Sequence, residues 1–140
     1  MLLNKIKKTK VDKLQLKKIE VIDQDTKLDK ICKRLVNHRD YLGIVKSKNP
    51  GIIIGVITGV DIAKYLCENK HVDLGKINAS YAMNSNYISA KSNETIDEIR
   101  NKLITKNLGK IIVFNNNDKP IGMITRESLA FQIKRMANLI

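Results

Sequence analysis

A short segment of the sequence brings together side chains that could bind a ligand. Residues 55–61 read GVITGVD, in which the hydroxyl of Thr58 is followed three positions later by the carboxylate of Asp61. The segment joins an apolar run to a helical pattern, and backbone N–H groups at the start of a helix attract anions. A hydroxyl beside such N–H groups suits a phosphate, and a carboxylate suits the hydroxyls of a ribose. Residues 122–128, GMITRES, repeat the segment without its carboxylate.

The same residues also have a purely structural explanation. Thr58 is suited to be the N-cap of the next helix, and Asp61 then falls at its third position, as in a capping box. A carboxylate at that position also interacts favourably with the helix dipole. Two observations favour a ligand site as well: the pattern recurs at Thr125, and the apolar run before each threonine predicts a buried strand.

Both segments belong to an internal repeat of about 67 residues. Residues 28–31 (LDKI) align with residues 96–99 (IDEI), and GVIT at 55–58 aligns with GMIT at 122–125. Two units of this size, each too small to bury a large core, normally pack on one another.

Each repeat predicts the element order β-α-β-β-α. Apolar runs and turn signals predict strands at residues 18–22, 41–46, 52–57, 87–90, 110–114 and 120–124. Helical spacing of apolar residues predicts helices that begin near residues 26, 61 and 93, and a last one that carries Leu129, Ile133, Met136 and Ile140.

The predicted fold class is therefore α/β (α+β), with two repeats and mixed sheets covered by helices. We divide the chain into a basic N-terminal arm at residues 1–10, a first repeat at 11–75 and a second repeat at 76–140. Residues 69–78 are polar, lack sustained periodicity and are interpreted as the linker.

Composition narrows the class of protein. The chain is 43% hydrophobic, which suffices for a globular core, and only 4% aromatic, so the core must be aliphatic. Two cysteines form no disulfide framework, and no apolar segment approaches the roughly 20 residues of a membrane span. With no export signal at the N-terminus, we expect a cytoplasmic protein in a reducing compartment.

Metal binding and catalysis have little support in the sequence. The possible metal ligands are Cys32, His38, Cys67 and His71, but their spacing is not that of paired ligands, and Cys32 falls on an apolar helix face. Neither histidine has an evident nucleophile or carboxylate partner, so we expect no metal and no enzyme activity.

The repeat, the element order and the two Gly-x-Ile-Thr segments together resemble the paired domains named after cystathionine beta-synthase, the CBS domains. The resemblance covers nearly the whole chain from about residue 11. It implies a stand-alone regulatory module with two clefts between the repeats, each able to take an adenosyl ligand such as AMP, ADP, ATP or S-adenosylmethionine. It also implies a homodimer and control of a partner protein, because ligand binding shifts a conformational equilibrium.

The resemblance also implies which residues contact the ligand. In the first cleft, Thr58 would contact phosphate or ribose and Asp61 would hold the ribose hydroxyls. Their neighbours and the adenine side would come from Ile57, Val60, Asn86, Tyr87, Ile88, Leu108 and Gly109. Thr125, Arg126 and Ser128 would line the second cleft.

The second cleft departs from the family pattern, because Ser128 stands where an aspartate is expected. A bidentate interaction of a carboxylate with two ribose hydroxyls is then lost. Because Arg126 and Lys110 are basic, this cleft is expected to favour a phosphate-rich ligand or to stay empty.

A different class of function is also open. The formal net charge is +12, from 26 Lys and Arg against 14 Asp and Glu, and much of it lies early in the chain. That balance favours an anionic partner, so the alternative is a basic module that binds nucleic acid or a protein and takes no nucleotide. A solvated lysine-rich surface explains the same composition.

Overall fold

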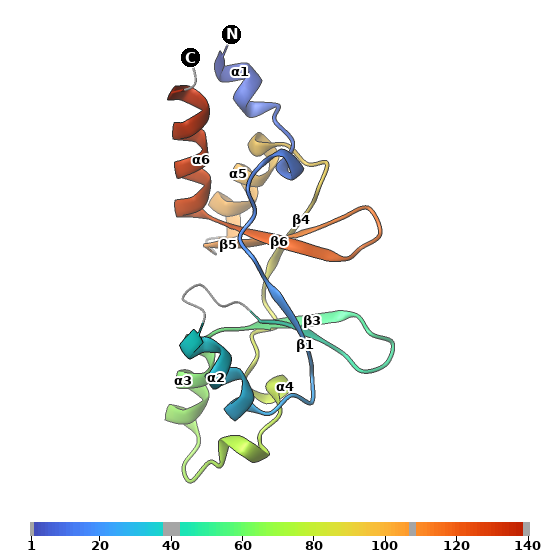
Figure 1. Cartoon of the computed structure of the whole chain (residues 1–140), viewed down its shortest axis with the longest axis vertical. Coiled ribbons are helices and arrows are strands. Elements are labelled where there is room, and N and C mark those ends of the chain that lie inside the picture. The colour runs from blue at the N-terminus through green and yellow to red at the C-terminus, as the bar shows by residue number, and fades with distance from the viewer. Residues whose placement is uncertain (1, 38–42, 107–108, 139–140) are drawn as a thin grey trace. The chain divides into compact units, whose positions relative to one another are not determined.

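The computed structural model describes residues 2–37, 43–106 and 109–138 (Figure 1). The chain forms two compact units. One comprises Lys18–Asn86 and is called here the first-repeat unit, and the other comprises Met1–Lys17 with Tyr87–Ile140 and is called the second-repeat unit.

The first-repeat unit is built on a three-stranded sheet. The order is β1-β2-β3, with β1 parallel to β2 and β2 antiparallel to β3. Its elements are β1 (Glu20–Asp23), α2 (Leu28–Asn37), β2 (Gly43–Lys46), β3 (Ile53–Ile57), α3 (Gly59–Glu68), the 3₁₀ helix η2 (Leu74–Lys76) and α4 (Ala79–Ala82). Leu28, Ile31, Val45 and Ile57 are fully buried in its core, as their apolar helix and strand positions predict.

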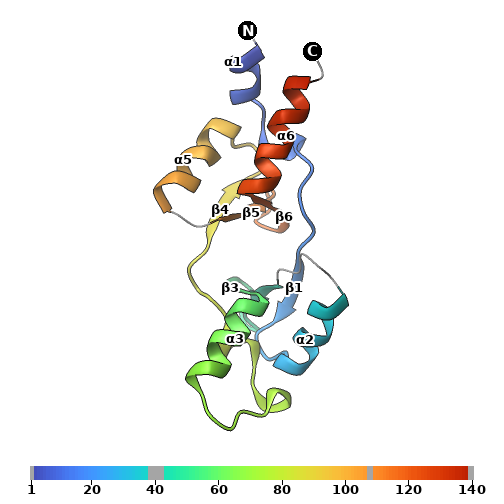
Figure 2. The ribbon, with the colours of Figure 1, turned by 90° about the vertical axis from the view of Figure 1, so that its left-hand side faces the viewer.

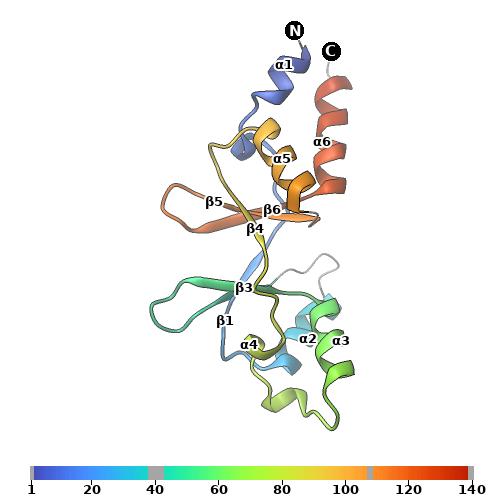
Figure 3. The ribbon, with the colours of Figure 1, turned by 180° about the vertical axis from the view of Figure 1, so that it is seen from behind.

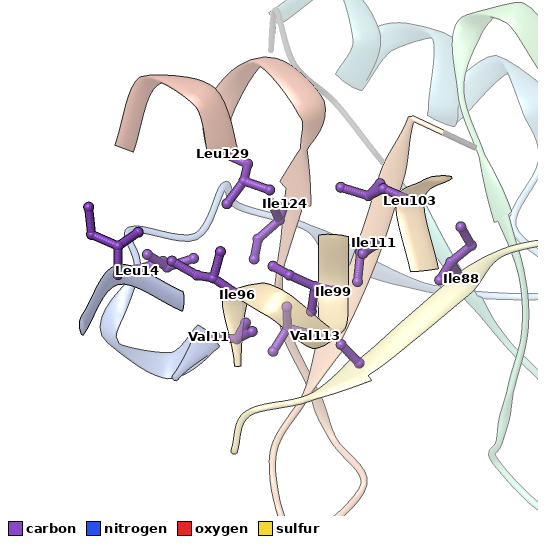
Figure 4. Close-up of a cluster of buried hydrophobic side chains, with 12 residues drawn as sticks. Val11, Leu14, Ile88, Ile96, Ile99, Leu103, Ile111, Val113, Ile124 and Leu129 are labelled. Atoms are coloured by element: carbon purple, nitrogen blue, oxygen red, sulfur yellow. The ribbon is translucent and has the colours of Figure 1, made fainter. Parts of the chain in front are cut away.

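The second-repeat unit has the same sheet topology, β4-β5-β6, with a parallel and an antiparallel pair. Its elements are α1 (Leu2–Lys7), the 3₁₀ helix η1 (Val11–Lys13), β4 (Ile88–Lys91), α5 (Ile96–Lys106), β5 (Lys110–Phe114), β6 (Pro120–Thr125) and α6 (Arg126–Asn138). Figure 4 shows its aliphatic core, in which Ile99 of α5 packs with Ile111, Val113 and Ile124 of the sheet.

The predicted order β-α-β-β-α is confirmed in both repeats. Element ends differ from the predictions by one to a few residues, and residues 41 and 42 of one predicted strand lie outside the described residues. Helices α1 and α4 and both 3₁₀ helices were not predicted, because each is too short to show a helical period. Part of the predicted linker is η2, whose Leu74 packs on the core.

The N-terminal segment is an integral part of the second-repeat unit. Helix α1 packs against α5 and α6, as all three ribbon views show (Figure 1, Figure 2 and Figure 3), and Ile6 is buried. Gln132 of α6 holds the backbone of Gln15, accepting from its N–H at 2.7 Å and donating to its carbonyl at 2.7 Å. Residues that carry the predicted basic arm are therefore fixed to the fold.

In each unit, a segment pairs with the last strand and crosses it at a glycine. Lys17 exchanges two backbone hydrogen bonds with Met123, and Asn84 exchanges two with Val56. A Cβ on Gly122 would lie 2.5 Å from the Leu16 Cβ, and one on Gly55 would lie 2.9 Å from the Asn84 carbonyl oxygen. Close approach therefore requires glycine at the start of both GVIT and GMIT.

Among the described residues, no helix combines the length and the apolar character that crossing a bilayer requires.

Candidate functional site

Thr58 and Asp61 form a hydrogen-bonded joint between β3 and α3. Thr58 is the N-cap residue, with the extended backbone that this position needs, and Asp61 is the third residue of α3. One carboxylate oxygen, Asp61 Oδ2, accepts hydrogen bonds from the Thr58 backbone N–H at 2.8 Å and from its hydroxyl at 3.0 Å. The predicted capping role of both residues is thus confirmed.

The capping bonds leave specific groups of this joint unused. Within the part of the chain that the structure describes, Asp61 Oδ1 accepts no hydrogen bond, and the backbone N–H groups of Gly59 and Val60 find no acceptor. Thr58 and Asp61 are half-buried, and Gly59 and Val60 are exposed. The joint therefore offers a ligand one charged acceptor for a hydroxyl group and two N–H donors for an anionic oxygen.

Thr125 and Ser128 form the equivalent joint between β6 and α6, but their hydrogen bonds run differently. The Ser128 hydroxyl accepts from the Thr125 N–H at 2.9 Å and donates to the Thr125 carbonyl at 3.1 Å, while the Ser128 N–H donates to Thr125 Oγ1 at 3.0 Å. Ser128 thus caps α6 as Asp61 caps α3, but it carries no charge. Its single hydroxyl proton already donates to the Thr125 carbonyl.

The second joint also has one backbone N–H group fewer to offer an anion. The Arg126 backbone N–H, which corresponds to that of Gly59, donates to the Gly109 carbonyl at 3.2 Å. The Arg126 guanidinium donates to the Leu103 carbonyl at 3.3 Å at the end of α5. Both contacts hold Arg126 against its own unit, and its role beside a phosphate-rich ligand stays a prediction.

The other predicted contact residues lie at varied depths. Ile57 is fully buried and Ile88 is 7% exposed, so both side chains belong to the cores of their units. Val60 is 78% exposed, Asn86 and Gly109 are exposed, and Tyr87 is half-buried. Leu108 lies outside the described residues.

The two units divide the predicted contacts between them. Ile57, Thr58, Val60, Asp61 and Asn86 belong to the first-repeat unit, and the other described ones belong to the second-repeat unit. Within the first, the Val56–Asn84 bridge is antiparallel, so residues after Asn84 run toward the beginning of β3, away from Thr58. The role of Asn86 beside the ligand therefore stays a prediction. From the sequence we did not predict that the segment around Asn84 crosses β3. The one signal for this crossing was Gly55, at the start of GVIT.

The possible metal ligands that the structure describes form no metal-binding cluster. Across the described ranges, no three His, Cys, Asp or Glu side chains are placed to hold an ion, and His38 lies outside those ranges. Burial, helped by the nearby Asp29 carboxylate, raises the pKa of the Cys32 thiol above its ordinary value. Cys32 is thus a protonated, partly buried side chain that packs against the core, as predicted.

Comparisons with known proteins identify the fold and one domain. Residues 76–135 match the profile of the CBS domain family. A CBS domain protein from Pyrobaculum aerophilum, complexed with AMP, superposes with a TM-score of 0.73 at 19% identity, over 93% of this chain and 99% of that one. The CBS domain pair of protein MJ0100, in complex with 5′-methylthioadenosine and S-adenosyl-L-methionine, gives 0.72 at 23% identity, over 91% and 97%.

A curated relative, an uncharacterized protein of Methanocaldococcus jannaschii, is 28% identical over 109 residues, or 77% of this chain. The chain spans about a quarter of the length of the first curated relatives it matches. These matches confirm the resemblance predicted from the sequence: residues 76–135 are a CBS domain, and the chain has the fold of a CBS-domain pair.

Proposed function

We propose that this CBS-domain pair is a regulatory module that binds an adenosine-containing ligand at the Thr58–Asp61 joint. The ligand class comprises AMP, ADP, ATP and S-adenosylmethionine. Binding shifts a conformational equilibrium of the module, and that shift controls a partner protein. The module carries out no reaction of its own, works in the cytoplasm and acts as a homodimer.

One observation carries the proposal. Asp61 caps α3 through Oδ2, and its Oδ1 accepts no hydrogen bond from any residue that the structure describes, so a ligand can use Oδ1 while the joint keeps its structure. A ribose hydroxyl that donates to Oδ1 forms a charge-assisted hydrogen bond, and the exposed N–H groups of Gly59 and Val60 suit a phosphate or carboxylate oxygen. The adenosyl ligands of the two solved CBS proteins support this ligand class.

The proposal includes two unequal sites. At the second joint the position of Asp61 is taken by Ser128, which has no carboxylate, and the N–H of Arg126 is already bonded to the Gly109 carbonyl. Neither a two-hydroxyl sugar nor a phosphate finds there the groups that the first joint offers. We therefore assign the adenosyl ligand to the Thr58–Asp61 joint.

A thermal-shift panel with AMP, ADP, ATP and S-adenosylmethionine tests the ligand class. A ligand present at about 100 times its dissociation constant stabilises the folded state by about 2.7 kcal/mol, which raises the melting midpoint. We expect a rise with at least one of these ligands. If none of the four ligands raises the melting midpoint, even in large excess over the protein, the proposal is contradicted.

The chain supplies its own matched variant. Asp61→Ser converts the first joint into the hydrogen-bond arrangement of Thr125 and Ser128, so the cap is kept and the charge is removed. Loss of one hydrogen bond to a charged group, worth about 1.5–3 kcal/mol, lowers ligand affinity about 10- to 100-fold. Unchanged affinity would show that the ligand does not use Asp61.

A further inference from the structure

We propose that a basic surface of the second-repeat unit binds the phosphate backbone of nucleic acid. This basic surface is formed by the cationic side chains of α1, η1 and the outer face of α6: Lys5, Lys7, Lys8, Lys10, Lys13, Lys134 and Arg135. Helix α1 lies beside α6 (Figure 1 and Figure 2), so two of the elements that carry these residues are neighbours in the unit. The proposal does not depend on the adenosyl ligand.

All seven cations are exposed, and within the described ranges none of them forms an ion pair. Carboxylates do lie on the same or adjoining elements, namely Asp12, Asp97, Glu98 and Glu127, but none of these pairs with the basic surface. When exposed cations of this kind neutralise the phosphates of a nucleic acid, the counterions condensed on the nucleic acid are released, and this release favours binding.

The lysines are held in place by the fold. Ile6 and Val11 are buried in the core between them, and the Val11 N–H donates to the Glu94 carbonyl at 2.8 Å. Lys10 forms a backbone bridge with Thr95. Because these backbone positions are already ordered, binding a polyanion costs less conformational entropy than it would for a flexible tail.

The first repeat is an internal control for this charge. Residues 73–81 correspond to residues 5–13 and make the same backbone bonds: Ala79 N–H donates to Thr26 as Val11 N–H does to Glu94. Leu74 packs on its core as Ile6 does. Residues 5–13 carry five lysines and one aspartate, whereas residues 73–81 carry one lysine and one aspartate. The shared fold does not require the lysines.

The outer face of α6 shows the same contrast. Phe131, Lys134 and Arg135 are spaced to share one helix face, and all three are exposed. The corresponding residues of α3 are Lys64, Cys67 and Glu68, which carry no net charge. Two separate elements of the second-repeat unit thus carry more positive charge than the corresponding elements of the first-repeat unit.

The charge and the apolar groups favour nucleic acid over a membrane. The second-repeat unit holds fifteen of the chain's 26 Lys and Arg but six of its 14 Asp and Glu. A helix that lies on a lipid surface turns its apolar face outward, whereas Ile6 of α1 is turned into the core. Phe131, 62% exposed beside Lys134 and Arg135, suits stacking against an unpaired base.

Fluorescence anisotropy with labelled oligonucleotides tests the proposal. The probes are single-stranded RNA, single-stranded DNA and duplex DNA of about 20 nucleotides, titrated at several salt concentrations. We expect salt-dependent binding. The triple variant Lys5→Gln, Lys8→Gln, Lys13→Gln should reduce the slope of log K against log salt by about 2 for single strands and about 3 for the duplex.

The matched control is Lys30→Gln, Lys33→Gln, Lys64→Gln, which removes three exposed lysines of the first-repeat unit that form no ion pair with any described residue. This variant has the same net charge as the first and should keep the wild-type slope. If both variants reduce the salt slope equally, the effect depends only on net charge, and the proposal is overturned. Binding to vesicles of phosphatidylcholine and phosphatidylserine with none to nucleic acid would also overturn it.

Discussion

Replacing Gly122 by alanine tests the crossing of the N-terminal segment over β6. The added Cβ would lie 2.5 Å from the Leu16 Cβ and 3.1 Å from the Lys17 carbonyl oxygen. Real Cβ atoms do not approach that closely, so the crossing segment has to move. Movement strains the two Lys17–Met123 backbone bonds, which are 2.9 and 3.0 Å long.

The magnitude follows from these contacts. Overpacking costs about 1–3 kcal/mol, and each backbone hydrogen bond that is weakened costs up to about 1 kcal/mol. Alanine offsets about 0.4–1 kcal/mol of this by restricting the unfolded chain. We expect a net destabilisation of about 1–3 kcal/mol, which lowers the melting midpoint by about 2–4 °C per kcal/mol.

The assay is urea and thermal unfolding of the ligand-free protein, followed by far-UV circular dichroism. Gly109→Ala is the control, because a Cβ there meets nothing within 4 Å and the same entropy gain applies. It should leave stability unchanged or slightly raised. A Gly122→Ala protein as stable as the Gly109→Ala protein would refute the close crossing.

Three further predictions concern the cap of α3, the hydrogen bonds of Gln132 to the N-terminal segment, and the two thiols. Gln132→Leu removes both part-buried bonds to the Gln15 backbone and should cost about 1–3 kcal/mol in urea unfolding, whereas Gln15→Ala keeps these bonds and should cost little. Asp61→Ala should lower the ligand-free stability by about 1 kcal/mol through loss of the cap, while Asp61→Ser should stay near wild type; equal losses would contradict the cap equivalence. Burial raises the pKa of the Cys32 thiol and shields it from solvent, whereas Cys67 is exposed, so Cys67 should react faster with a thiol reagent at mildly alkaline pH. Single Cys→Ser variants identify which thiol reacts, and a faster Cys32 would be the contrary result.

The sequence predicted the repeat and its element order because periodic apolar residues and turn signals are local. Ile99 and Ile111, for example, lie at positions where their helix and strand patterns require burial, and both are fully buried. It did not predict how residues 2–17 pack, because residues 1–10 were interpreted as a basic arm and no element was predicted before residue 18. Their apolar positions, such as Ile6 and Val11, are too few to show a period, and their burial depends on contacts with distant residues such as Glu94.

For the candidate site too, the sequence predicted the local geometry but not the atomic contacts. The capping geometry of Thr58 and Asp61 follows from three-residue spacing and was predictable. Which oxygen of Asp61 remains open depends on atomic positions that spacing does not determine. Likewise, the GMIT segment predicted the second joint, but the bond between the Arg126 N–H and the Gly109 carbonyl had no sequence signal.

Isothermal titration of the ligand-free protein with AMP and with S-adenosylmethionine tests the central claim most directly. We predict that one ligand binds per chain, at the joint that carries the open Asp61 Oδ1, and that Asp61→Ser lowers its affinity about 10- to 100-fold without lowering the melting midpoint. An adenosyl ligand that binds wild type and Asp61→Ser with equal affinity would contradict the assignment of the site to Thr58 and Asp61.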